Sequence, residues 1–122
     1  MFRHEPVSTL LIEDRGTAAW SIPALLSHGQ SAWVRLTQAD DLQTGLSRFS
    51  TTSFDIVLLT VASASHALAA IDQVRAIRAT CPVIIMGELD DAALATSVIE
   101  RGAADYLVHG QCDGAGLARA IH

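Results

Sequence analysis

The sequence predicts an α/β domain in which a parallel sheet is covered by helices on both faces. Apolar segments alternate with Ala-rich amphipathic segments along the whole of the 122 residues. Three of the apolar segments contain almost no polar residue, which is typical of strands buried on two faces rather than one. The length fits one domain with a substantial core, so we treat residues 1–122 as a single domain.

We expect a strand at each apolar segment. The expected strands are Val7 to Ile12, Ala32 to Leu36, Asp55 to Val61, Pro82 to Met86 and Asp105 to Val108. Parallel strands joined through helices cross over with a right hand, and both faces of the sheet are then covered. These rules lead to a flavodoxin-like (βα)5 doubly wound sheet with strand order 2-1-3-4-5.

Two of the connecting segments repeat apolar residues at helical spacing. After the third strand, the repeat consists of Leu68, Ile71, Val74 and Ile77, with His66 expected to open the helix. After the fourth strand, the repeat consists of Leu94, Val98 and Ile99, with Asp90-Asp91 before it and Gly102 as the expected stop. Acidic residues favour a helix start and glycine favours a helix end, so we expect two helices here.

The first and last helices are expected on weaker patterns. Pro23 lies inside the segment from Gly16 to His28, and a proline beyond the first turn of a helix costs about 3 kcal/mol. We therefore expect this helix to start late, near Ser21. The last helix is expected from Asp113 to the end of the sequence, where the pattern stops midway. This pattern predicts that the domain is the N-terminal part of a longer protein.

Charge and cysteine content exclude several classes of function. The net charge is −5, with 13 acidic and 8 basic residues, and all the basic residues are Arg. Nucleic acid binding requires clustered positive charge, so we expect none. No apolar run approaches the roughly 20 residues of a membrane span, and no signal peptide is evident. Cys81 and Cys112 lack ligand spacing, so we expect reduced thiols, no zinc site and a cytoplasmic protein.

Ligands bind to a sheet of this order beyond the carboxyl ends of its strands. We expect these ends to carry Glu13-Asp14, Thr60, Gly87 and His109. The segments that lead to three of them resemble response-regulator receiver domains over most of the chain. These segments are Phe54 to Thr60, Pro82 to Gly87, and Gly102 to His109, of which the last is the most diagnostic.

The resemblance implies a phosphorylation site that has lost its chemistry. Receivers have an acidic pair after strand one, a phosphoacceptor Asp after strand three, Thr or Ser after strand four and Lys after strand five. This chain matches the acidic pair but has Thr60, Gly87 and His109 at the other positions. Phosphoryl transfer to a carboxylate needs an ionised nucleophile and donors around the phosphoryl oxygens. We therefore expect a pseudo-receiver that is not an enzyme, is not phosphorylated and needs no cofactor.

The remaining polar residues at these ends keep two interpretations. Glu13 and Asp14 either cap the turn into the first helix or form a weak divalent-metal site, since Mg²⁺ is bound through one or two carboxylates. Thr60 is expected to satisfy backbone groups. His109 either pairs with the acidic residues or lies exposed.

The resemblance also gives Tyr106 a role. In receivers, an aromatic residue at this position changes orientation on activation, and the face of helix four, strand five and helix five binds partners. Without phosphorylation we expect Tyr106 to keep one orientation, inward or outward. We therefore expect a protein-interaction or dimerisation module in bacterial two-component or cyclic-di-GMP signalling. The alternative is a small-molecule or ion sensor that uses the strand-end pocket.

Overall fold

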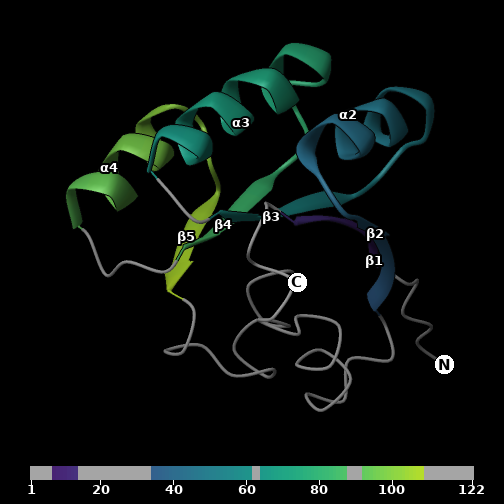
Figure 1. Ribbon diagram of the computed structural model, residues 1–122, viewed down its shortest axis with the longest axis horizontal. Helices are drawn as coiled ribbons and strands as arrows, with labels where there is room; N and C mark the ends of the chain where they lie inside the picture. The colour runs from purple at the N-terminus through teal and green to yellow at the C-terminus, as the bar shows by residue number, and fades with distance from the viewer. Residues whose placement is uncertain (1–6, 14–33, 62–63, 88–91, 109–122) are drawn as a thin grey trace, which may run out of the picture.

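The fold is a five-stranded parallel sheet with strand order β2-β1-β3-β4-β5 (Figure 1). It is seen in a computed structural model of the chain, which describes residues 7–13, 34–61, 64–87 and 92–108. The strand order and the parallel direction are those predicted, so the flavodoxin-like fold class is confirmed.

The strands fall close to the predicted segments. They are β1 Val7–Glu13, β2 Val34–Ala39, β3 Ile56–Val61, β4 Val83–Gly87 and β5 Asp105–Val108. The largest error is at β2, which we expected from Ala32 to Leu36. This strand lies at the edge of the sheet and alternates polar and apolar residues, so its apolar run ends before the strand does.

Three described helices lie on the same side of the sheet (Figure 1). They are α2 Leu42–Thr51, α3 Ala64–Ile77 and α4 Ala92–Glu100. Helix α3 begins two positions before His66, so the predicted start was slightly late. The segments of the first and last expected helices lie outside the described residues, as does Asp90-Asp91. None of the described helices is long and apolar enough to cross a bilayer.

Local signals fix the ends of two of these helices. The side chain of Asp41 caps α2 by accepting a hydrogen bond from the backbone N–H of Thr44 at 2.7 Å, and this bond lowers the pKa of the Asp41 carboxyl. After α4, Gly102 has a φ of +111°, a backbone conformation that favours glycine. The predicted stop at Gly102 is therefore confirmed.

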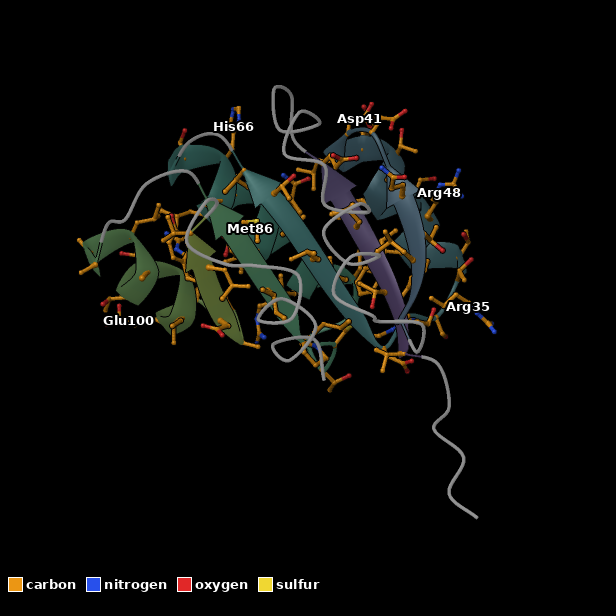
Figure 2. The ribbon with its side chains drawn as sticks, turned by 90° about the horizontal axis from the view of Figure 1, so that it is seen from below. Arg35, Asp41, Arg48, His66, Met86 and Glu100 are labelled. Carbon is orange, nitrogen blue, oxygen red and sulfur yellow. The ribbon has the colours of Figure 1, made fainter. Side chains whose placement is uncertain are left out.

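Both faces of the sheet are buried. The face toward the helices contributes Leu10, Ile12, Val57, Leu59, Val83 and Ile85 to the main core, together with Phe49, Ile71 and Val74 from the helices. The opposite face, seen in Figure 2, includes Met86 and is buried as well. Two isoleucines in the predicted helical stripes lie outside the core, because Ile77 is 39% exposed and Ile99 is 49% exposed.

Candidate functional site

Glu13 and Thr60 are neighbours at the carboxyl edge of the sheet. Glu13 is the last residue of β1, and Thr60 is its register partner on β3. Register partners on adjacent strands project to the same face, which here is the face turned away from α2, α3 and α4. Glu13 is 5% exposed and Thr60 is 1% exposed. The predicted proximity of these two residues is thus found in the structure.

The buried carboxylate of Glu13 has a partner that the sequence did not reveal. Gln38 of β2 donates a hydrogen bond from Nε2 to Oε1 of Glu13 at 2.8 Å. A buried charged group is costly without hydrogen bonds, and this amide supplies one. Gln38 is the register partner of Leu11 and therefore projects to the same face as Glu13. Only this register identifies Gln38 as part of the site.

Thr60 places a buried hydroxyl beside this carboxylate. A threonine hydroxyl is not ionised near neutral pH and is a weaker ligand for a hard cation than a carboxylate. Within the described ranges, no three His, Cys, Asp or Glu side chains lie close enough together to hold a metal ion. Asp14, the second member of the predicted acidic pair, lies outside the described residues. The metal hypothesis for Glu13 and Asp14 therefore stays a prediction.

Gly87 and Tyr106 form a second contact at the same edge. A Cβ atom built on Gly87 would collide with Oη of Tyr106 and would lie 3.0 Å from its Cζ. The tip of the Tyr106 ring thus occupies the space that a side chain at position 87 would need. Tyr106 is half-buried and packs against the main core. Of the two orientations that the sequence left open, the ring has the inward one.

The two contacts lie on opposite faces of the sheet. Gly87 ends β4 and is the register partner of Val61, whose side chain belongs to the core beneath the helices. Tyr106 packs into that same core, whereas Glu13 and Thr60 project to the other face. Of the predicted site residues that the structure describes, Glu13 and Thr60 therefore lie on one face of the sheet and Gly87 on the other. His109 lies outside the described part of the chain.

Cys81 lies at the amino end of β4, away from the site, whereas His66 lies near the carboxyl end of β3. Cys81 is a free cysteine that is 6% exposed and belongs to the main core. Burial raises the pKa of its thiol, so the thiol stays protonated and a poor nucleophile. His66 is exposed at the start of α3, as expected.

Comparison with known proteins identifies the fold. No protein-family model matches the chain, and no curated protein matches it. A solved orphan response regulator from H. pylori is 16% identical with a TM-score of 0.78, over 98% of this chain and 96% of the other. A receiver domain from Clostridium thermocellum is 23% identical with a TM-score of 0.74, over 94% and 90%.

The chain has the fold of a response-regulator receiver domain. The pilus assembly protein CpaE from Caulobacter crescentus shares this fold, with 18% identity and a TM-score of 0.75 over 99% of this chain and 95% of that one. In each comparison the agreement covers at least 90% of both chains. At these identities the likeness concerns the fold, and function has to be argued from the site.

Proposed function

We propose that this domain is a receiver-fold signalling module that acts through protein contacts and without phosphorylation. The observation that carries the proposal is Thr60, which stands at the end of β3 where receivers have their phosphoacceptor Asp. Its side chain is buried, with 1% exposure, and offers a neutral hydroxyl instead of a carboxylate. Attack on a phosphodonor requires an ionised oxygen or a base that activates a hydroxyl.

The rest of the edge supports the same proposal. Receivers have a hydroxyl side chain at the position of Gly87, and here the ring of Tyr106 fills that space. Position 87 therefore has no side chain that could donate a hydrogen bond to a phosphoryl oxygen. The carboxylate of Glu13 already accepts a hydrogen bond from Gln38. Position 87 thus serves packing of the Tyr106 ring, and Glu13 serves a hydrogen bond to Gln38, in place of roles in phosphoryl transfer.

The inward ring of Tyr106 gives the proposed interaction surface a fixed shape. This surface is the α4–β5 face, and the last expected helix would extend it. Ile99 of α4 is 49% exposed, and β5 is an edge strand whose four residues are all partly exposed. An edge strand presents backbone groups that can pair with a protein partner or a second copy of the chain. The fold shared with an orphan response regulator supports a role in bacterial two-component signalling. We propose a cytoplasmic module, in two-component or cyclic-di-GMP signalling.

Intact mass spectrometry after incubation with acetyl phosphate and Mg²⁺ tests the lack of phosphorylation. We expect the unmodified mass alone, because position 60 has no carboxylate. A phosphorylatable receiver treated in parallel shows that the phosphodonor is active. A phosphoryl adduct at useful stoichiometry on this domain would overturn the proposal.

Two isoleucine variants test the interaction surface. Ile99→Arg places a charge on the α4–β5 face, and Ile77→Arg places one on α3, where a second isoleucine is also exposed. In sedimentation of the purified protein over a range of concentrations, we expect Ile99→Arg to weaken self-association at least tenfold and Ile77→Arg to leave it unchanged. Equal effects of the two variants would argue against the α4–β5 face, and a monomer at all concentrations would reject self-association.

A further inference from the structure

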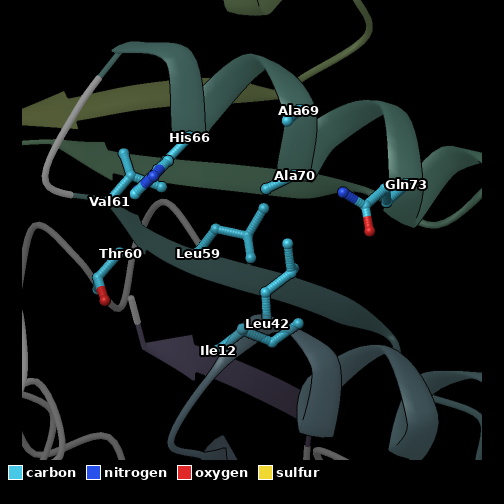
Figure 3. A pocket seen from close by; sticks show the side chains of 9 residues that line it. All are labelled: Ile12, Leu42, Leu59, Thr60, Val61, His66, Ala69, Ala70 and Gln73. Carbon is cyan, nitrogen blue, oxygen red and sulfur yellow. The ribbon is translucent and has the colours of Figure 1, made fainter. Parts of the chain in front are cut away.

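A pocket of about 250 Å³ lies between α2 and α3, above the carboxyl ends of β1 and β3 (Figure 3). Its floor is formed by Ile12 of β1 and Leu59 of β3, and Leu42 of α2 and Ala70 of α3 form opposite walls. His66 and Gln73 of α3 add polar groups to the lining. Thr60 also lines the pocket. The contacts of Glu13 with Gln38 and of Gly87 with Tyr106 lie outside it.

The pocket exists because α3 has small side chains where it faces α2. Ala69 and Ala70 line the pocket, and Ala70 is 3% exposed, so it cannot fill the space between the helices. Nearer the end of α3 the two helices are bridged by larger groups. The guanidinium of Arg78, just beyond α3, lies 5.1 Å from the ring centroid of Phe49 in α2. The strands below are fully buried, so the floor is rigid and the pocket is formed before any ligand binds.

The lining fits an uncharged and mainly apolar molecule. Among the described residues that line the pocket, none is Asp, Glu, Lys or Arg. An apolar cavity of about 150 Å³ takes up benzene and is not filled by water, so this larger pocket has room for one or two fused rings. The imidazole of His66 and the amide of Gln73 both donate and accept hydrogen bonds. Figure 3 shows both side chains lying beside the apolar floor.

We propose that this pocket binds a small neutral aromatic molecule that carries one hydrogen-bonding group. The rings lie on Ile12, Leu59 and Ala70, and the polar group meets His66 or Gln73. Such a ligand adds a sensing function to the domain, and this function does not depend on the absence of phosphorylation. Ligand binding in the pocket and the lack of phosphorylation are therefore tested by separate experiments, and failure of one proposal does not imply failure of the other.

Indole is a suitable probe, since it has two fused rings and one N–H donor. We expect saturable changes in the amide NMR signals of His66, Ala69 and Ala70 when indole is added to the full chain. For a ligand of this size, a dissociation constant of about 1 mM or below is a reasonable expectation. Benzoate, which is charged, should bind at least tenfold more weakly. Absence of saturable changes up to the solubility limit of indole would overturn the proposal.

A pair of substitutions on α3 locates the binding site. Ala70→Leu fills the pocket and should weaken indole binding at least tenfold, whereas Ala76→Leu, at an exposed position of the same helix, should leave it unchanged. Gln73→Leu provides a second test that does not disturb the core, and it should weaken indole binding severalfold. Binding that survives both Ala70→Leu and Gln73→Leu, in variants shown to be folded by circular dichroism, would place indole elsewhere and reject the site.

Discussion

The two ends of the sheet's carboxyl edge differ in the kind of contact that their residues make. At the β1–β3 end, Glu13 and Thr60 keep buried polar groups, and Gln38 satisfies the carboxylate. At the β4–β5 end, Gly87 has no side chain and the ring of Tyr106 takes its space. Compared with a receiver, the β1–β3 end differs in polarity, because Thr60 is neutral, and the β4–β5 end differs in shape, because Gly87 has no side chain.

This difference has a consequence for signalling. The polarity of the side chains at Glu13 and Thr60 determines which ligand can bind at this edge. It does not alter the backbone of β1 or β3. The absence of a side chain at Gly87 leaves the space that the ring of Tyr106 occupies, and Tyr106 belongs to a strand of the proposed interaction surface. In the proposed function, the β4–β5 end therefore connects the carboxyl edge of the sheet to the α4–β5 face, and the β1–β3 end does not.

The largest expected effect is that of Gly87→Thr. The new side chain collides with Oη of Tyr106, and overpacking of this kind costs about 2–3 kcal/mol of unfolding free energy unless the ring moves outward. Urea unfolding measures the cost. In a Tyr106→Ala background the same substitution should cost less than about 1 kcal/mol, because the collision is gone. An equal cost in both backgrounds would show that the two residues are not coupled.

A smaller effect is expected from Gln38→Leu at the other end. This substitution removes the hydrogen bond to the buried carboxylate of Glu13, and we expect it to lower the unfolding free energy by about 1–2 kcal/mol. Gln43→Leu, at an exposed position of α2, is the matched control and should change stability little. The ring of Tyr106 should be unaffected, since it lies on the opposite face. A change in the environment of the Tyr106 ring on Gln38→Leu would show that the two ends of the edge are coupled.

The smallest predicted effect is a gain in stability. Thr9 lies on the same face of β1 as Glu13, and its buried hydroxyl has no hydrogen-bond partner among the described residues. Thr9→Val replaces this hydroxyl by a methyl group and should raise the unfolding free energy by about 1 kcal/mol. Thr37→Val, at a partly exposed position of β2, should be nearly neutral. Destabilisation by Thr9→Val would mean that the Thr9 hydroxyl has a partner.

The sequence predicted the sheet well because continuous apolar runs define parallel strands without any knowledge of their contacts. It also placed Glu13, Thr60 and Gly87 at one edge, since the ends of parallel strands meet there. It missed Gln38, because that residue is identified only by the register of β2, whose bounds were the least accurately predicted. The orientation of Tyr106 was also left open. That orientation depends on the space above Gly87, which exists only once β4 and β5 are paired.

Asp14 and His109 remain predictions from the resemblance alone, since both lie outside the described residues. The proposed absence of phosphorylation depends on Thr60 and Gly87, which the structure describes. It is therefore independent of where these two side chains lie.

The orientation of Tyr106 in the presence of a phosphoryl analogue tests the central claim most directly. Tyr106 is the only tyrosine in the chain, so ring-labelled tyrosine gives NMR signals from this residue alone. We predict that these signals are unchanged when beryllofluoride and Mg²⁺ are added, and that they show contacts between the ring and the backbone of Gly87. A shift of the ring signals to a second state on addition of beryllofluoride and Mg²⁺ would contradict the account.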